Sequence, residues 1–226
     1  MNILHCNAYD SGGGAAIAAA RLHTALMEQG IGSCLGVLRV TADIPDSFSL
    51  TRRWRRAMQP LALRLDQFPL YGCPGRDRSV LFTPGLYPSR IYHDINKKRA
   101  DILHLHWIAH GFIPTFALRR LQRPIVWTLH DTWAFTGGCH ILKGCKEYLS
   151  GCRRCLQLAA SGRCNPARLS FNQKMRAYQR LQPHVAIWLN ECAKALCLAR
   201  TLVKSSRILL MYVYFSLWNR QRPGIC

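Results

Sequence analysis

Residues 2–40, "NILHCNAYDSGGGAAIAAARLHTALMEQGIGSCLGVLRV", decide the fold. The opening "NILHC" (2–6) is a short apolar run that is typical of a buried parallel strand. "DSGGG" (10–14) interrupts this run, and the alanine-rich segment after it predicts a helix that ends near Gly30. "SCLGVLRV" (33–40) supplies a second strand. A strand, a glycine loop, a helix and a strand in this order predict an α/β fold with a parallel sheet and right-handed crossovers.

Two more strands are predicted downstream, "ADILHLHWI" (100–108) and "PIVWTLHD" (124–131), with a short helical piece around "PTFALRRLQ" between them. Residues 41–100 are less regular, and their helical stretch "RRWRRAMQPLALRLDQF" is interrupted at Pro60. Both downstream strands end in polar residues, where open α/β sheets place their ligands. We therefore expect the functional residues at the carboxyl edge of the sheet.

Composition favours a folded, strongly basic protein. The 226 residues are 49% hydrophobic, and the formal net charge is +20. This excess favours anionic partners such as nucleic acid, acidic lipid headgroups or phosphorylated substrates. Beyond one basic knot, "RRWRR" (52–56), the charge is spread out, so we expect peripheral contact with an anionic membrane and no nucleic acid. The longest apolar run, "ILLMYVYFSLW" (208–218), is about half of what a membrane span needs.

The cysteine content indicates thiol chemistry in a reducing compartment. There are eleven cysteines, and the opening "MNILHCNAYDSGGG" lacks the features of an export signal, so we expect a cytoplasmic protein. Four of the cysteines, Cys139, Cys145, Cys152 and Cys155, end in a C-x-x-C, but only that last pair has zinc-knuckle spacing. Structural zinc and clustered free thiols are both compatible with this pattern, and no other cofactor is required. A zinc-containing basic nucleic-acid-binding module is the alternative function that these residues leave open. A basic helix, "ARLSFNQKMRAYQRLQ", follows them.

Three consecutive glycines, Gly12, Gly13 and Gly14, stand between the first strand and its helix. Glycines there let the backbone approach a ligand, and the N–H groups of the helix start can meet an anion. A tight turn that needs a positive φ is the alternative reading. The dinucleotide fingerprint G-x-G-x-x-G fails because alanines follow Gly14, and no acidic residue closes the second strand, so a nicotinamide cofactor is disfavoured. The loop remains a candidate for a phosphate or a sugar.

His130 and Asp131 stand at the C-terminal end of the predicted strand "PIVWTLHD" (124–131). A histidine at this edge can act as an acid, a base or a hydrogen-bond donor to a sugar hydroxyl, so both residues are catalytic candidates. A histidine satisfied by its local backbone is the competing interpretation. His104 and His106 alternate with apolar residues on the neighbouring strand, and we expect them in the core or behind the reacting groups.

Segments 1–33, 100–113 and 123–158 together resemble the N-terminal half of a retaining glycosyltransferase of family 4, which has the two-domain GT-B architecture. The most specific of them is "RPIVWTLHDTWAFTGGCHILKGCKEYLSGCRRCLQL" (123–158), which is similar to the subgroup of bacterial exopolysaccharide and colanic-acid-type gene clusters. The resemblance covers roughly residues 1–198, with residues 41–99 matching loosely.

The resemblance implies a Rossmann-like acceptor-side domain that faces a second domain across a cleft. It implies transfer of a sugar from a nucleotide-sugar donor to a glycan or a polyprenyl-linked acceptor, in cell-surface polysaccharide biosynthesis at the inner face of the cytoplasmic membrane. By the same resemblance, Gly12 to Gly14 lie near the donor phosphates and His130 lies near the transferred sugar. Asp131 follows His130 in the motif.

The end of the chain departs from the family pattern. By the resemblance we expect the C-terminal domain that binds the nucleotide-sugar donor to be missing from this chain, and therefore little activity from this chain alone. Residues 199–226 do not resemble the family, and their codons in another frame can encode a family-like continuation, so we expect a misfitted, out-of-frame tail. The strand before the helix "WLNECAKAL" is expected to be cut short after Val185. A genuine short chain that binds the acceptor without catalysis, with an amphipathic or membrane-associating end, is the alternative.

Overall fold

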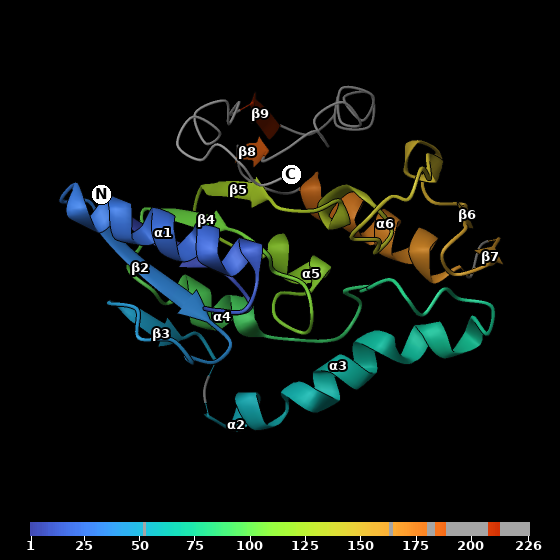
Figure 1. Ribbon diagram of the computed structural model, residues 1–226, viewed down its shortest axis with the longest axis horizontal. Coiled ribbons are helices and arrows are strands. Elements are labelled where there is room, and N and C mark those ends of the chain that lie inside the picture. Colours follow the sequence, from blue (N-terminus) through green and yellow to red (C-terminus); the bar gives the residue numbers. More distant parts are fainter. Residues whose placement is uncertain (52, 163–164, 180–183, 189–207, 213–226) are drawn as a thin grey trace, which may run out of the picture.

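The computed structural model describes residues 1–51, 53–162, 165–179, 184–188 and 208–212, with backbone alone for 54, 55 and the last two segments. Seven strands in these ranges form one sheet in the order β3-β2-β1-β4-β5-β8-β9, and every neighbouring pair is parallel (Figure 1). The strands are β1 (Asn2–Cys6), β2 (Gly32–Val37), β3 (Ser47–Ser49), β4 (Ile102–Leu105), β5 (Ile125–Leu129), β8 (His184–Trp188) and β9 (Ile208–Tyr212). The short strands β6 (Arg154–Cys155) and β7 (Ala160–Ser161) form a separate antiparallel pair. The predicted α/β, Rossmann-like sheet is confirmed.

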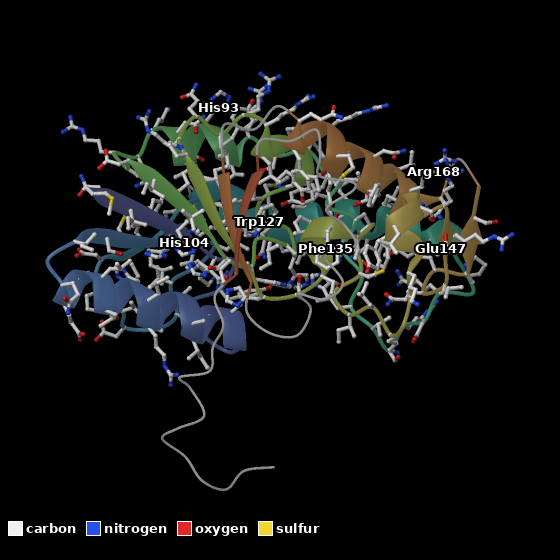
Figure 2. All side chains as sticks on the ribbon, turned by 90° about the horizontal axis from the view of Figure 1, so that it is seen from above. His93, His104, Trp127, Phe135, Glu147 and Arg168 are labelled. Carbon is white, nitrogen blue, oxygen red and sulfur yellow. The ribbon has the colours of Figure 1, made fainter. Side chains whose placement is uncertain are left out.

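Helices cover both faces of the sheet. They are α1 (Gly14–Glu28), α2 (Arg53–Ala57), α3 (Gln59–Gln67), α4 (Ile91–Asn96), α5 (Thr115–Leu118) and α6 (Pro166–Tyr178), with 3-10 turns η1 (Phe68–Gly72), η2 (Trp133–Phe135) and η3 (Glu147–Ser150). Helix α1 lies on one face, and α4 and α5 lie on the other (Figures 1 and 2). In the described part of the chain, no helix is both long and apolar enough to cross a membrane.

The central strands pack on both faces, as their apolar sequences require. Leu4 of β1 and Leu103 and Leu105 of β4 are fully buried in the main hydrophobic core. On the other face, Ala19 of α1 is fully buried and packs with Leu35 of β2, because a small side chain lets the helix approach the strands closely. Removing one such side chain, as in Leu103→Ala, would cost about 2–5 kcal/mol of folding free energy.

The predicted strands and helices discussed here are present, but some of them begin or end at other residues than predicted. Strand β1 has the predicted bounds, and α1 stops two residues before Gly30, whose φ of 72° turns the chain away. The predicted interruption at Pro60 is confirmed, because the proline stands in the first turn of α3 and separates it from α2. Strand β3 was not predicted, since three residues, "SFS", carry no readable alternation.

One expectation about the end of the chain is wrong for the residues that the structure describes. Strand β8 is not cut short after Val185; it continues to Trp188 and pairs with β5 along its length, up to the pair Leu129↔Trp188. Within the expected misfitted tail, residues 208–212 form β9, which pairs parallel with β8 at the sheet edge. Backbone hydrogen bonding along a sheet edge accepts an apolar strand whatever its sequence origin. The helix predicted at "WLNECAKAL" and the rest of the tail lie outside the described residues.

Candidate active site

A pocket of about 420 Å³ opens where β1, β4 and β5 end. The sheet order reverses between β1 and β4, and open parallel sheets bind ligands at such a switch point. The pocket brings together the predicted glycine loop, His130 and Asp131, which lie on separate segments of the sequence. Its volume is in the usual range for a small-molecule site. It is lined by Asn7, Tyr9, Ser11, Gly12, Gly13, Gly14, Ala15, Ala16, Trp107, His130 and Asp131.

The three glycines serve two different purposes. Gly12 has a φ of 79°, which a side chain would strain. Gly13 is extended, with φ −163°, and Gly14 begins α1, so neither position requires glycine for its backbone. A Cβ atom at any of the three would meet nothing within 4 Å. The tight-turn reading therefore explains Gly12, whereas Gly13 and Gly14 keep one wall of the pocket free of side chains.

The start of α1 faces this pocket with the chemistry of an anion site. Its N-cap, Gly13, offers no side chain to the first-turn N–H groups, and the first turn holds no acidic residue. Uncapped N–H groups and the positive end of the helix dipole both favour a bound anion. The loop before the helix is held in place by Asp10, whose Oδ2 accepts hydrogen bonds from the amides of Thr41 (2.5 Å) and Ala42 (3.0 Å).

Three pocket residues that the sequence analysis did not select join the ends of β1 and β4. The amide of Trp107 donates to Asn7 Oδ1 at 2.8 Å, and the Trp107 carbonyl accepts from Ala8 N at 2.8 Å. The ring of Tyr9 stacks on Trp107 with 5.8 Å between centroids. These contacts form between segments that are far apart in the sequence. The sequence could therefore show only that each residue follows a predicted strand, and not which residues meet.

Asp131 stands in the pocket wall as a carboxylate with defined partners. Its Oδ2 accepts from Trp107 Nε1 at 2.7 Å and lies 2.5 Å from His140 Nδ1, and its Oδ1 accepts from the Trp133 amide at 2.8 Å. Burial opposes ionisation, but these hydrogen bonds from His140, Trp133 and Trp107 outweigh it and hold the pKa of Asp131 below its usual value. A carboxylate has about four lone-pair positions, so one remains for a substrate hydroxyl. Sequence reasoning missed His140, which also contacts Thr83 through Nε2.

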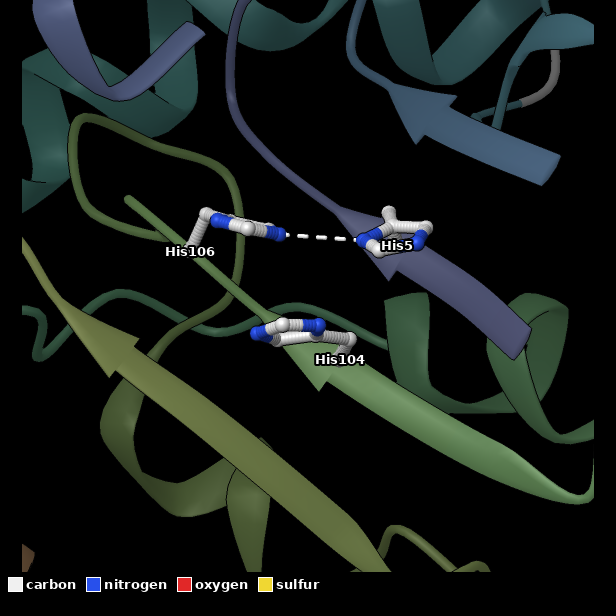
Figure 3. A group of neighbouring side chains, drawn as sticks. All are labelled: His5, His104 and His106. Carbon is white, nitrogen blue, oxygen red and sulfur yellow. Dashed lines mark hydrogen bonds between the residues drawn. The ribbon is translucent and has the colours of Figure 1, made fainter. Parts of the chain in front are cut away.

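His130 ends a chain of buried imidazoles that runs behind the pocket. His130 Nε2 lies 3.2 Å from His106 Nδ1, and His106 Nε2 lies 3.1 Å from His5 Nδ1 (Figure 3). Burial lowers the pKa of His130 to about 4, partly offset by Asp131, and lowers that of His5 to about 3, so these rings are neutral near pH 7. A neutral imidazole donates from one nitrogen and accepts on the other. The tautomer of one of these three rings therefore determines the tautomers of the other two. This arrangement leaves His130 Nδ1 for a ligand.

The histidines behind the pocket form a packed stack. The ring nitrogens of His5, His104 and His106 lie within 4.8 Å of one another, which suggests a metal site. However, His104 and His106 are stacked at 4.3 Å with 24° between their planes, so their in-plane lone pairs run side by side instead of meeting at one point. His104 Nε2 is also 2.8 Å from Thr128 Oγ1. The prediction that His104 and His106 belong to the core is confirmed, at 6% and 3% exposure.

The four predicted cysteines lie outside the pocket, in the segment between η2 and α6, where Cys155 belongs to β6. Cys139, Cys152 and Cys155 are buried, Cys145 is half-buried, and all four are free thiols. They connect to the pocket through the chain itself, because Cys139 precedes His140. Figure 1 shows this region, with β6, β7 and α6, on the opposite side of the molecule from β2 and β3.

Comparison with known proteins supports one relationship. No family model matches the chain. Over 169 residues the chain is 30% identical to a protein of Escherichia coli (strain K12) named "Putative colanic acid biosynthesis glycosyl transferase WcaC". The match covers 69% of this chain, and the chain spans 39% of the length of that relative. The chain is thus a distant homologue of a protein named as a glycosyl transferase, as the resemblance of its motifs indicates.

Proposed function

We propose that this chain takes part in sugar transfer during the biosynthesis of a bacterial surface polysaccharide, as a family 4, GT-B-type glycosyltransferase. One observation carries the proposal: an uncapped helix start, a neutral histidine and an ionised carboxylate converge in one pocket at the switch point of the sheet. The homology to a named glycosyl transferase supports the same reading.

In this proposal the glycine loop holds the phosphate of a nucleotide-sugar donor. The N–H groups at the start of α1 would donate to the phosphate oxygens, and the bare backbone of Gly13 and Gly14 would allow the close approach that these bonds need. A ligand with two negative charges would also be attracted by the net charge of +20.

His130 and Asp131 then orient the sugar. His130 Nδ1 would bond a sugar hydroxyl, while its Nε2 stays on His106, which prevents the ring from turning. The remaining lone pair of Asp131 would accept from a second hydroxyl, and the contacts from Trp107 and His140 fix its carboxylate. Holding reactants in this way lowers the entropic part of the barrier. These roles require no metal ion in the pocket.

The acceptor side suits a lipid-linked glycan at a membrane surface. Helix α3 and its neighbours expose the large side chains Met58, Leu61, Leu65, Phe68 and Tyr71. A second pocket of about 300 Å³ lies beside them, with Met58, Leu61, Leu65 and Phe112 among its lining. The exposed Arg53 and Arg64 stand on α2 and α3. Apolar side chains beside arginines are the pattern of an interfacial helix, so we propose peripheral contact here with anionic lipid.

Calorimetric titration of UDP- and GDP-linked hexoses into the purified chain tests the proposal. At least one should bind, because the start of α1 and His130 offer phosphate and sugar contacts on this chain itself, and His130→Ala should weaken it tenfold or more, about 1.4 kcal/mol. His93→Ala is the matched control, because His93 is exposed on the sheet face opposite α1 (Figure 2). Binding is measured because little turnover is expected from this chain alone, and turnover above the His130→Ala level would contradict that expectation.

Two results would overturn the proposed function. One is the absence of binding for every nucleotide-sugar and for polyprenyl-phosphate sugars in vesicles. The other is tight, steeply salt-dependent binding of single- or double-stranded nucleic acid, which the alternative basic zinc module predicts.

A further inference from the structure

One aromatic side chain of the pocket has no role in the contacts proposed so far for phosphate and hydroxyl groups. Tyr9 lies on the segment between β1 and the glycine loop, lines the pocket and is 38% exposed. Trp107, a half-buried residue of the same lining, stacks on Tyr9 with 5.8 Å between the ring centroids and 26° between the ring planes. Trp107 therefore covers one face of the Tyr9 ring, and the part of the ring that stays exposed belongs to the pocket wall.

The Tyr9 side chain is held in place although it is exposed. Its hydroxyl is hydrogen-bonded to His110 Nδ1, and its carbonyl accepts from Asn7 Nδ2 at 2.5 Å. Asn7 Oδ1 accepts from the Trp107 amide at 2.8 Å, so one side-chain amide ties the backbones of Tyr9 and Trp107 together. The Trp107 ring is fixed as well, because its Nε1 donates to Asp131. A ring that is already fixed loses little conformational entropy when a ligand packs on it.

His110 supports these two rings from an unusual backbone conformation. Its φ of 59° lies in the left-handed region, which residues with a side chain rarely adopt. Its ring lies beside both aromatic rings, with centroids 6.0 Å from that of Tyr9 and 6.1 Å from that of Trp107. Residues kept in such conformations occur most often at binding sites, where the surrounding structure maintains them. The backbone of His110 is thus a further sign that the position of Tyr9 matters for a ligand.

A fixed aromatic face beside groups that bind hydroxyls suits a sugar ring. A pyranose has a face of C–H groups that packs on an aromatic ring by dispersion and by attraction to the negative face of the ring. Its hydroxyl groups project from the rim, where Asp131 and His130 Nδ1 of the same pocket can bond them. Trp107 connects the two parts of such a site, since its ring backs Tyr9 and its Nε1 bonds Asp131.

A nucleobase could also stack on this face, but the pocket offers little to the edge of a base. Proteins read bases by hydrogen bonds to their edges in addition to stacking. Asn7 supplies the side-chain amide of the described lining, and it is 1% exposed, with Oδ1 bonded to Trp107 and Nδ2 bonded to Tyr9. A base would therefore stack without partners for its edge, whereas a sugar finds partners for its hydroxyl groups.

We propose that Tyr9, backed by Trp107, is a stacking platform for the C–H face of a pyranose ring. This inference rests on the proposed function and assigns the sugar ring a contact that the proposed function does not include. The hexose of a nucleotide-sugar donor and the terminal sugar of an acceptor both present such a face. The experiment therefore uses a probe for each of them.

Saturation-transfer NMR on the purified full chain tests the platform. UDP- and GDP-linked hexoses are the donor probes, and methyl hexosides and lactose are the acceptor probes. In the wild-type chain, saturation should pass from aromatic protons to the C–H protons of a sugar, with intermolecular NOEs between that sugar and the Tyr9 ring. These NOEs need no variant, so the platform stays testable if a substituted chain fails to fold.

Two substitutions separate the ring face from the hydroxyl. Tyr9→Leu should weaken binding of the stacked probe about fivefold or more, whereas Tyr9→Phe should keep it within about twofold, because phenylalanine loses only the contact with His110. Tyr71→Leu is the matched control, because Tyr71 is 74% exposed on η1 and is not part of the pocket lining. NOEs to the hexose of a nucleotide-sugar would support the platform with the donor on it, and NOEs to a phosphate-free sugar would support it with the acceptor.

Four results would overturn the platform. They are wild-type affinity in Tyr9→Leu, an equal loss of affinity in Tyr9→Phe, NOEs from Tyr9 to the base in place of the sugar, and the absence of NOEs from Tyr9 to any probe. A nucleotide-sugar bound normally by Tyr9→Leu but weakly by His130→Ala would overturn the platform and leave the proposed function standing. A methyl hexoside that stacks on Tyr9, while no nucleotide-sugar or polyprenyl-phosphate sugar binds, would do the reverse.

Discussion

The imidazole of His140 lies against the carboxylate of Asp131, with Nδ1 2.5 Å from Oδ2. His140 is 7% exposed, and its other nitrogen contacts Thr83. This pair joins the cysteine loop to the pocket wall, so the two regions are mechanically connected. His140 adds a third hydrogen-bonding partner to the Asp131 carboxylate, beside Trp107 and Trp133.

Truncation of this histidine should therefore affect both stability and binding. We expect His140→Ala to lose about 1–3 kcal/mol of unfolding free energy, because it leaves the Asp131 carboxylate and Thr83 with one partner fewer. Affinity for the pocket ligand should fall as Asp131 loses its fixed position. Urea unfolding and calorimetry measure the two effects. Ile141→Ala is the neighbouring control, since Ile141 is 63% exposed; equal stability of the two variants would contradict the prediction.

Substitution of the pocket glycines should separate binding from folding. Gly13→Ala should leave the unfolding free energy within about 0.5 kcal/mol of wild type, because its backbone is extended and nothing lies within 4 Å of the added Cβ. The methyl group would nevertheless stand where the phosphate approaches, so nucleotide-sugar affinity should fall. Gly30→Ala, at a φ of 72°, should show the reverse: about 1–2 kcal/mol less stability and unchanged affinity. If Gly13→Ala binds the nucleotide-sugar with wild-type affinity, the glycine loop does not take part in binding it.

The buried histidines should make the fold sensitive to mild acid. Burial, with a smaller effect of His130, lowers the pKa of His104 to about 4, against 6.5 for an ordinary histidine. The unfolded chain therefore binds the extra proton first, so stability is lost as the pH falls from 6.5 towards 4. At pH 5 the loss is about 2 kcal/mol for each such histidine. Wild type should lose stability steeply between pH 7.5 and pH 5.

His104→Gln isolates one of these contributions. Glutamine does not titrate here and can still bond Thr128 Oγ1. The difference in unfolding free energy between pH 7.5 and pH 5 should shrink by about 2 kcal/mol relative to wild type. Urea unfolding at the two pH values provides the measurement, and identical pH dependence in both proteins would contradict it.

Asp66 should have the opposite pH dependence. It is 1% exposed, and burial raises its pKa to about 6 despite hydrogen bonds from the amides of Leu86 and Gly85. Because the folded state holds this proton more tightly than the unfolded one, its stabilising effect is present below pH 3.8 and is lost as the pH rises through 6. Asp66→Asn, which cannot ionise, should be more stable than wild type at pH 8 by about 1–3 kcal/mol and nearly equal at pH 4. A less stable variant at pH 8 would contradict this assignment.

The sequence predicted those parts of the site that depend on strand ends alone. Gly12 to Gly14 follow one predicted parallel strand, His130 and Asp131 end another, and parallel strands bring their carboxyl ends to one edge. Short apolar runs with clear boundaries made β1 and β5 readable. The position of the site at the carboxyl edge of the sheet was therefore predictable from the sequence.

The partners of these residues were not predictable in the same way. His140 meets Asp131 through an irregular loop, and Tyr9 meets Trp107 across the sheet, so neither contact leaves a periodic signal. The coupling of His5 to His106 depends on the register of β1 against β4. Strand β9 was not predicted, because no partner could be assigned to this apolar segment from its side chains. Its pairing with β8 depends on backbone groups that every sequence carries.

Amide and indole chemical shifts during a nucleotide-sugar titration test the central claim most directly. The account predicts that the amides of Gly12 to Gly14 and the indole Nε1 of Trp107 shift together with one saturation curve, because all line the pocket. The amide of Gly30, at the far end of α1, and the indole of Trp127, whose Nε1 donates to the His106 carbonyl inside the core, should stay in place. Saturable shifts confined to other residues, with the glycine loop and Trp107 unmoved, would contradict the account.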